Sequence, residues 1–188
     1  MDTNTQLETI TLGGGCFWCI EAVFLELQGV VKVVSGYAGG QTQNPSYQEV
    51  CGGNTRHAEV CKVTFDPTKV TLKEILEVFF TVHDPTTLNR QGNDVGDQYR
   101  SIILYNDDNQ KTIATQVLQE ANEVIYNNEI VTTIEKLDKF YIAEEYHQNF
   151  YARNPTQGYC RVVISPKVAK FRKKYFEKLK NKEIIAKN

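Results

Sequence analysis

Three consecutive glycines, Gly13 to Gly15, impose an abrupt change of backbone near the start of the chain. Before them, from Leu7 to Leu12, apolar and polar residues alternate as they do in a strand. After them, four apolar residues recur at helical spacing: Ile20, Val23, Phe24 and Leu27. The chain therefore opens with a strand, a glycine turn and a helix, and Cys16 stands where the helix begins.

The later periodic segments predict the fold class. Residues 30–34 and 59–65 are rich in β-branched residues and predict two strands. Thr71 with Glu74 forms a capping-box pattern before an apolar helical face. Residues 100–105 predict another strand, and a helix follows Asp107. This βαββαβ order is typical of an α+β fold with a ferredoxin-like split βαβ core, a mixed sheet carrying helices.

No linker or repeat divides the 188 residues, so we expect a single domain, 1–188. Two loops, 36–54 and 83–98, are long for a compact domain and are where we expect a site. The segment 167–188 is basic and carries apolar residues at helical spacing. It predicts an amphipathic helix that packs on the domain, with an acidic partner or a membrane surface as the alternative.

Charge and cysteine content restrict the environment and the partners. A formal net charge of -2 gives no attraction for nucleic acid, and no apolar run could cross a membrane. The first residues lack the pattern of a secretory signal, so we expect a cytoplasmic protein. Five cysteines are an odd and sparse set, which favours reactive thiols over structural disulfides. The sequence shows no oligomer seam, and we expect a monomer.

Cys16 is the candidate nucleophile. Backbone amides and the positive end of the helix dipole surround a side chain at a helix N-terminus, which favours the thiolate. The glycines before it leave room for a ligand to approach the backbone. Phe17 and Trp18 follow directly and would line an apolar pocket suited to a methyl or thioether group.

Several motifs together resemble peptide methionine sulfoxide reductases of the A type. In chain order they are Gly15-Cys16-Phe17-Trp18-Cys19, Gly36-Tyr37-Ala38-Gly39-Gly40, Asn44-Pro45-Ser46-Tyr47, His57-Ala58-Glu59, Arg90-Gln91-Gly92-Asn93-Asp94 and Gln98-Tyr99-Arg100-Ser101. The resemblance extends from about residue 8 to about residue 160. It implies reduction of the S epimer of methionine sulfoxide, free or within oxidised proteins.

The resemblance also implies roles for the polar residues of these motifs. Attack of a thiolate on a sulfoxide places negative charge on the oxygen, so a proton donor must lie within reach. We expect Glu59 to be this donor, with its pKa raised by burial. Tyr47 and Tyr99 would add hydroxyl donors, and Asp94 would complete the polar side of the pocket.

A second thiol is needed to trap the sulfenic acid that Cys16 would become. We favour Cys160, which resembles a resolving cysteine on a mobile C-terminal segment, over Cys19, which lies one helical turn from Cys16. Cys51 and Cys61 are interpreted as packed and inert. The disulfide would be reduced by a thioredoxin, or by dithiothreitol in vitro, because the sequence has no fingerprint of a bound cofactor.

Two other functions fit parts of the pattern. Cys16 and Cys19 form a C-x-x-C pair, which is also typical of a thioredoxin-like disulfide oxidoreductase. A metal-binding module is the second alternative, although its spacing lacks the paired ligands of structural zinc sites; its candidate ligands are Cys51, His57, Cys61, His83 and His147. We expect His57 to orient its neighbours and to share a strand face with Glu59.

Overall fold

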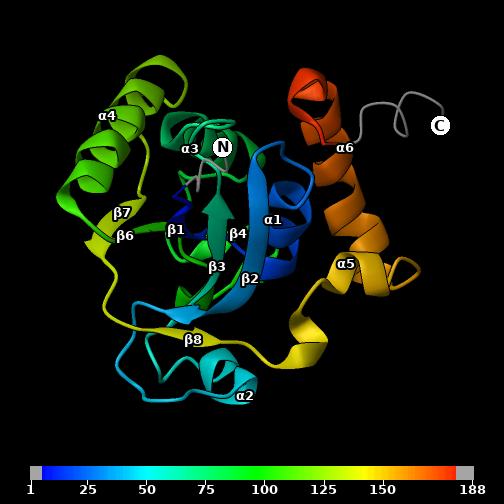
Figure 1. Ribbon diagram of the computed structural model, residues 1–188. Helices are drawn as coiled ribbons and strands as arrows, with labels where there is room; N and C mark the ends of the chain where they lie inside the picture. Colours follow the sequence, from blue (N-terminus) through cyan, green and yellow to red (C-terminus); the bar gives the residue numbers. More distant parts are fainter. Residues whose placement is uncertain (1–5, 181–188) are drawn as a thin grey trace.

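A six-stranded mixed sheet forms the centre of the computed structural model, which describes residues 6–180 (Figure 1). Its strand order is β7-β6-β1-β3-β2-β8. The pair β6 and β7 is parallel, and the other neighbours are antiparallel. The strands are β1 (Glu8–Gly13), β2 (Val30–Ala38), β3 (Ala58–Phe65), β6 (Ile102–Tyr105), β7 (Thr133–Lys136) and β8 (Phe140–Ile142). A separate hairpin joins β4 (Arg90–Gln91) to β5 (Asp94–Val95).

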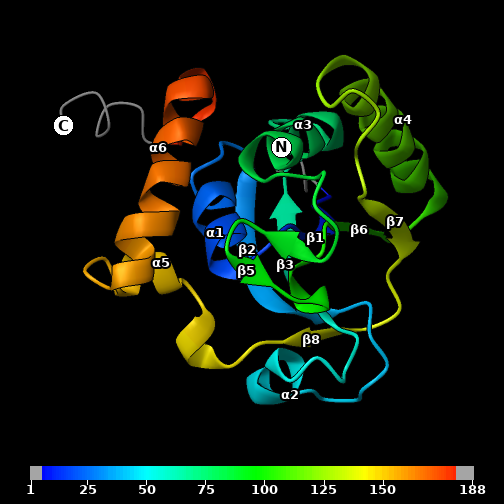
Figure 2. The same cartoon turned by 180° about the vertical axis from the view of Figure 1, so that it is seen from behind.

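Helices cover one face of this sheet (Figure 2). They are α1 (Phe17–Phe24), α3 (Leu72–Val82), α4 (Asp108–Val124), α5 (Phe150–Arg153) and α6 (Ser165–Lys174), whereas the short α2 (Tyr47–Cys51) lies below β8 at the lower end of the molecule (Figure 1). The main core lies between β1, β3 and the helices α1, α3 and α4. Along β3 the alternate residues Cys61, Val63 and Phe65 enter this core, and Glu59 continues the same alternation toward the beginning of the strand.

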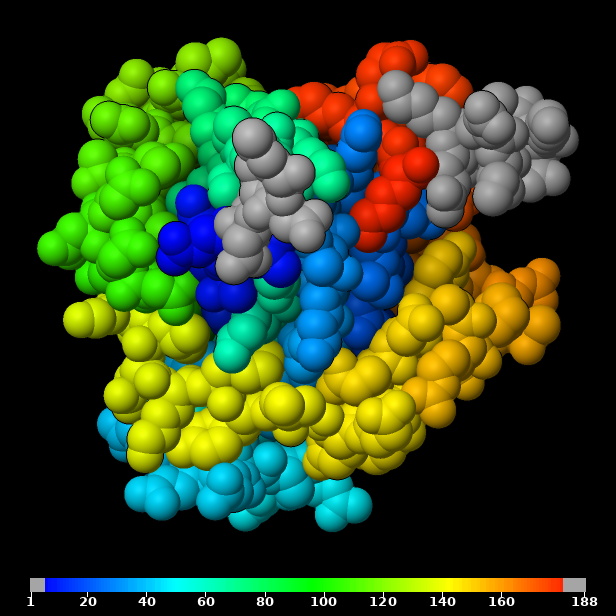
Figure 3. Space-filling view, in the orientation of Figure 1, coloured from blue at the N-terminus to red at the C-terminus, as the bar shows by residue number. Residues whose placement is uncertain are grey.

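The opposite face of the sheet carries a smaller apolar cluster. Ala58, Val60 and Ile102 belong to it, and Leu137 and Phe140 pack over it from the segment between β7 and β8. Figure 3 shows this part of the chain, in yellow, running across the lower part of the molecule. Both faces of the sheet are therefore covered, one by helices and one by an extended segment.

The structure confirms the α+β class and the order of the six main elements predicted from periodicity. It also confirms both helix caps: Thr71 and Glu74 form a complete capping box, and Asp107 caps α4. The hairpin β4-β5, the strands β7 and β8, and the short helices α2 and α5 are additional. Within residues 6–180, no helix combines the length and the apolar character needed to cross a membrane.

The basic C-terminal segment differs from the expected helix over 167–188. Helix α6 ends at Lys174, a 3₁₀ turn covers Phe176–Lys178, and Leu179 then forms a bridge to Leu27. Residues 181–188 lie outside the described residues. The helix begins earlier than expected because a π-helical stretch, Cys160–Ile164, leads directly into it. Val168 and Phe171 bury its apolar face, as predicted.

Candidate active site

Cys16 is the N-cap residue of α1 and follows the glycine turn at the end of β1. Glycine is required at these positions because side chains of other residues of the protein pack directly against the backbone of the turn. A Cβ atom on Gly14 would lie 2.9 Å from the His83 ring, and one on Gly15 would lie 2.8 Å from Cβ of Gln91. Gly15 also has a φ of +89°, which favours glycine. The expectation that these glycines leave space for a ligand is therefore wrong, because the protein's own side chains fill that space.

Glu59 lies directly beneath the start of α1. Its Oε2 atom accepts a hydrogen bond of 3.1 Å from the backbone N–H of Phe17, so the carboxyl group satisfies a free amide of the first helical turn. Only 1% of Glu59 is exposed. Burial raises its pKa to about 8, with additional contributions from Asp94 and Cys19. Glu59 is thus a carboxylic acid that keeps its proton at neutral pH.

Cys16 and Cys19 behave as one ionising pair. Burial, followed by the hydrogen bond with Cys19, raises the pKa of the Cys16 thiol well above its ordinary value. The same hydrogen bond lowers the pKa of Cys19 to about 7 against the effect of its burial, and the Lys167 ammonium lowers it further. The expected thiolate at a free Cys16 is wrong for this state, because burial outweighs the helix dipole. The hydrogen bond between the two thiols thus raises the pKa of Cys16 and lowers that of Cys19.

The two tyrosines and Asp94 predicted for the site do lie around Glu59. Glu59 contributes electrostatically to the raised pKa values of Tyr47 and Tyr99, and Asp94 also acts on Tyr99. Burial is the main cause of both shifts, so the two hydroxyls remain protonated donors. The long loops 36–54 and 83–98 supply or adjoin these residues. Segments far apart in the sequence thereby meet around one carboxyl group.

The aromatic residues after Cys16 have different environments. Phe17 is 1% exposed and belongs to the core, so it does not form an open pocket wall. Trp18 is half-buried, and its ring stacks on Phe150 with centroids 3.7 Å apart and planes 6° apart. Tyr159 meets the Trp18 ring edge-on. The apolar wall next to Cys16 is therefore built by Trp18 with partners from the C-terminal third of the chain.

Glu144 organises the tyrosine side of the site. Its two carboxylate oxygens accept hydrogen bonds of 2.8 Å, one from the Tyr37 hydroxyl and one from the backbone N–H of Tyr47. The carboxylate therefore fixes the position at which α2 begins. The Tyr47 hydroxyl is hydrogen-bonded to the thiol of Cys51, at the other end of this five-residue helix.

His147 connects Trp18 to the tyrosine side. Its Nδ1 atom accepts a 3.1 Å hydrogen bond from Trp18 Nε1, which leaves the proton of the neutral ring on Nε2. Burial lowers the pKa of His147, so the neutral ring is the stable form. The buried Nε2 has no hydrogen-bond partner among the described residues, and its ring packs 4.4 Å from that of Tyr47. The imidazole thus aligns the indole with the tyrosine.

The remaining cysteines differ in exposure. Cys61 is fully buried and its thiol donates to the backbone oxygen of Phe17, in agreement with a packed, inert residue. Cys51 is exposed, so its interpretation as a packed residue is wrong. Cys160 has no exposed surface. Its N–H is held by the Gln157 side chain, in contrast to the accessible position expected for it.

The residues of the predicted metal module are dispersed. The His57 ring forms hydrogen bonds with the Gly40 backbone N–H and the Thr42 backbone oxygen, and so orients the loop after β2. The His83 ring forms hydrogen bonds with the Phe79 backbone oxygen and the Ser101 hydroxyl. Across residues 6–180, no cluster of three or more histidine, cysteine or acidic side chains could hold a metal ion. Each histidine is engaged with a different part of the fold.

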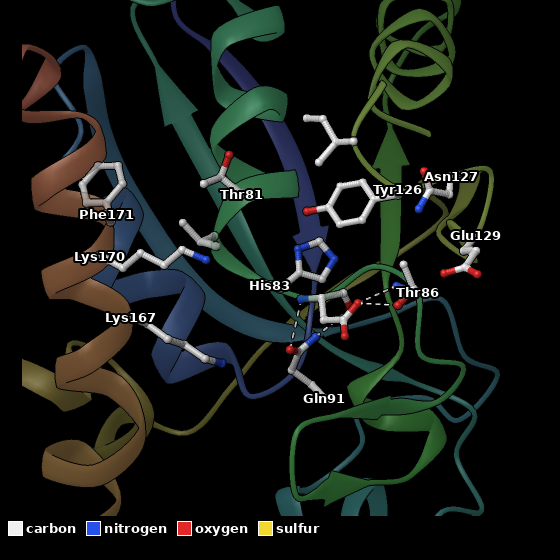
Figure 4. A pocket seen from close by; sticks show the side chains of 13 residues that line it. Thr81, His83, Thr86, Gln91, Tyr126, Asn127, Glu129, Lys167, Lys170 and Phe171 are labelled. Atoms are coloured by element: carbon white, nitrogen blue, oxygen red, sulfur yellow. Dashed lines mark hydrogen bonds between the residues drawn. The ribbon is translucent and has the colours of Figure 1, made fainter. Parts of the chain in front are cut away.

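A cavity of about 500 Å³ lies on the far side of the glycine turn, between the end of α3, the β4 strand and α6 (Figure 4). His83 and Gln91, which pack against Gly14 and Gly15, form part of its wall. Lys167 and Lys170 extend toward it from α6. Lys167 links this side of the molecule to the site, since its Nζ lies 3.6 Å from Sγ of Cys19.

The sequence did not identify the residues supplied by the C-terminal third: Glu144, His147, Phe150, Tyr159 and Lys167. They lie in short turns and helices without a clear period. Their partners are about 65 to 148 residues away. The available signal was the density of aromatic and ionisable residues between 140 and 151, which exceeds what a surface linker needs.

Comparison with known proteins relates this chain to a single family. A model of the family described as peptide methionine sulfoxide reductase matches residues 8–180. A protein of Natronomonas pharaonis named peptide methionine sulfoxide reductase MsrA is 55% identical over 172 residues, which cover 91% of this chain and 97% of the relative.

Solved structures agree with this match. Methionine sulfoxide reductase A of Corynebacterium diphtheriae superposes with a TM-score of 0.78 at 38% identity, covering 84% of this chain and 79% of that one. Mxr1 from Saccharomyces cerevisiae in complex with Trx2 superposes with a TM-score of 0.56 at 28% identity, covering 78% and 86%. The comparisons do not favour a thioredoxin-like disulfide oxidoreductase.

Proposed function

The chain belongs to the peptide methionine sulfoxide reductase family, and we propose that it reduces the S epimer of methionine sulfoxide through the sulfur of Cys16. The observation that carries this proposal is the juxtaposition of Cys16 with the protonated, buried Glu59. A sulfoxide needs a nucleophile at its sulfur and an acid at its oxygen, and these two groups lie at the same helix terminus.

In the first step Cys16 loses its thiol proton to solvent and attacks the sulfoxide sulfur as a thiolate. The Glu59 proton is transferred to the sulfoxide oxygen, with the Tyr47 and Tyr99 hydroxyls stabilising the charge that develops there. The protonated oxygen then transfers to the Cys16 sulfur: its new bond to Cys16 forms as its bond to the substrate sulfur and the transient sulfur–sulfur bond break, which releases methionine and leaves Cys16 as a sulfenic acid. Glu59, now a carboxylate, regains its proton from solvent.

The substrate methyl group would lie against the aromatic wall. Trp18 presents its half-buried ring next to Cys16, and its orientation is fixed by His147 and Phe150. Apolar and aromatic surface is suited to a methyl thioether, whereas the polar side of the site would receive the oxygen. Asp94 accepts a 2.6 Å hydrogen bond from the Tyr159 hydroxyl and so holds this tyrosine over the site. The two sides together would select one epimer.

A second thiol, Cys19 or Cys160, then attacks the sulfenic acid, forming a disulfide and releasing water. A thioredoxin would reduce this disulfide and restore the enzyme, and dithiothreitol would replace it in vitro. The complex of Mxr1 with Trx2 supports thioredoxin as the reductant. We propose no bound cofactor. Free methionine sulfoxide and oxidised proteins are both proposed substrates.

We also propose a ferredoxin-like split βαβ core, which the strand order β6-β1-β3-β2 and the helices α1 and α3 support. The fold is proposed to be one domain, 1–188, whose basic end from residue 167 packs on it through α6. We also propose a cytoplasmic monomer without a membrane partner, and the near-neutral charge supports the absence of a nucleic-acid partner.

Turnover of the two separated epimers of methionine sulfoxide with dithiothreitol tests the proposal. We expect the wild type to consume the S epimer, and Cys16→Ser to lose at least about 10³-fold in rate because a hydroxyl is a poor nucleophile without an activating base. Cys61→Ser, which changes a buried thiol of the core, is the matched control. Equal rates on both epimers, or an active Cys16→Ser variant, would contradict the proposal.

A further inference from the structure

The sulfur of Cys19 has an environment built from two distant segments. Lys167 Nζ, on α6, lies 3.6 Å from it, and the Tyr159 hydroxyl also interacts with it. Cys19 itself is 2% exposed. An ammonium group in contact with a buried sulfur stabilises the thiolate, because little solvent is present to screen the charge. Figure 4 shows Lys167 reaching inward from α6 toward α1.

Cys19 also lies in the correct place to react with Cys16. The two residues are one helical turn apart, and the backbone N–H of Cys19 donates to the backbone oxygen of Cys16 at 3.1 Å. Their side chains are hydrogen-bonded to each other. Cysteines at this spacing form disulfides in other C-x-x-C pairs.

Cys160 is less well placed than Cys19 to attack an oxidised Cys16. It starts the π-helical stretch Cys160–Ile164, and its backbone oxygen accepts a hydrogen bond from the Ser165 hydroxyl. Its thiol is buried, and burial raises its pKa, with a further rise from nearby Cys19. A protonated thiol anchored in a helix is a slow nucleophile unless the segment moves.

We propose that Cys19 resolves the sulfenic acid on Cys16 and that Lys167 is a positioning residue that holds Cys19 ready for this attack. The inference rests on the proposed function. The Cys19 thiolate, having released its proton to solvent, attacks the Cys16 sulfur; the Cys16 sulfur–oxygen bond breaks, and the hydroxyl group takes up one proton from solvent and leaves as water. Cys16 and Cys19 are thereby oxidised together to one disulfide, which the external dithiol reduces.

A single turnover without reductant separates the steps. Trp18 is the one tryptophan of the chain and lies between the two cysteines, so its fluorescence reports their oxidation. Methionine release is measured in the same samples, and the disulfide is identified by mass spectrometry after alkylation. In the wild type we expect a Cys16–Cys19 disulfide. In Cys19→Ser we expect methionine release with a persistent sulfenic acid that dimedone traps.

Lys167→Met tests the positioning role. We expect disulfide closure at pH 7 to slow about tenfold relative to methionine release by the same variant, because fewer Cys19 side chains are thiolates. The defect should shrink toward pH 9, and Lys167→Arg should restore closure. Lys170→Met, which removes an exposed ammonium from the same helix, is the matched control. Tyr159→Phe provides a second test if Lys167→Met fails to fold.

The ionisable groups around Cys19 are Cys16, Glu59, Tyr159 and Cys160, and the charged group in contact with it is the Lys167 ammonium. The closure rate is therefore compared at each pH with that of the Lys170→Met control. A Cys16–Cys160 disulfide in the wild type, or closure in Lys167→Met that matches the control at pH 7, would overturn the inference. Absence of methionine release from the wild type would instead refute the proposed function itself.

Discussion

The reactive groups and the groups that surround them come from two differently built regions. Cys16, Glu59 and Tyr99 belong to the first hundred residues and are held at one end of the central strands, where β1 ends and β3 and β6 begin. The aromatic wall and the charges around it come from residues 144–167, which consist of short turns and helices. The first region therefore fixes where the reacting atoms lie. The second region shifts the pKa values of these groups and forms the wall that would hold the substrate.

This difference is visible in how each region is held. The strand carrying Glu59 pairs with a strand on both sides, so a shift of the carboxyl group would disrupt two ladders. Glu144, His147 and Tyr159 are instead held by individual side-chain hydrogen bonds to the first region. Substitutions in the first region should consequently affect the chemical step strongly, and those in the second should have graded effects.

The largest expected effect within this comparison is that of Glu59→Gln. The amide cannot transfer a proton, so we expect the methionine release step to fall about 10²–10³-fold. The ratio of wild-type release to Glu59→Gln release should be constant below pH 8 and fall about tenfold per pH unit above it, because the acid form of Glu59, with its pKa of about 8, is then lost. Stopped-time assays of both proteins from pH 6 to 10 measure this. A parallel decline in both would assign the titration to another group.

The same carboxyl group should affect stability with a defined sign. Its pKa is higher in the folded protein than in the unfolded chain, so the stability it contributes is present at low pH and is lost as pH rises from about 4.5 to about 8. The free energy of unfolding should therefore fall less for Glu59→Gln than for the wild type across this pH range, and the difference should be on the order of 3 kcal/mol. Urea unfolding at pH 5 and pH 8.5 tests the difference.

An intermediate effect is expected for Glu144→Gln, in the second region. An amide can accept from the Tyr37 hydroxyl or the Tyr47 N–H through its one oxygen, but not from both. We expect kcat/KM to fall about tenfold, equivalent to about 1.4 kcal/mol, with the chemical step still dependent on Glu59. Glu145→Gln, at an exposed neighbour, is the control. A loss as large as that of Glu59→Gln would remove the distinction between the two regions.

The smallest expected effect is that of Phe150→Leu, which removes the ring stacked on Trp18. We expect KM for the S epimer to rise about threefold with little change in kcat, since the aromatic pair contributes about 0.5–1.5 kcal/mol beyond its buried area. Phe176→Leu changes a partly exposed ring in the 3₁₀ turn after α6 and is the control. A change confined to kcat would show that the wall also aligns the reacting atoms.

The sequence predicted the first region well because its elements carry strong periods. The alternation of β1 and β3, the helical face of α3 and its Thr71–Glu74 capping box are local patterns, and local patterns can be read without knowing the fold. Glu59 was expected in the site from the family resemblance, and in the structure it continues the buried alternation of β3. Its raised pKa was expected from burial, and burial is its main cause in the structure.

The sequence predicted the second region poorly because its contacts are long-range. Nothing near Lys167 indicates Cys19, which precedes it by 148 residues. The charge of the cysteine pair also depends on burial and on shared protons, whereas sequence position indicates only the helix dipole. For this reason Cys16 was expected to be the thiolate, whereas burial raises the pKa of its thiol in the structure.

The exposure of Cys51 has a practical consequence for work on this protein. Among its five cysteines, all within the described part of the chain, Cys51 alone is open to solvent. A bulky alkylating reagent added to the folded protein will therefore label this sulfur first. Since the Cys51 sulfur is hydrogen-bonded to the Tyr47 hydroxyl, labelling would perturb Tyr47 while leaving the Cys16 sulfur unmodified. Partial inactivation by such reagents is consequently not a measure of how many molecules carry a competent Cys16.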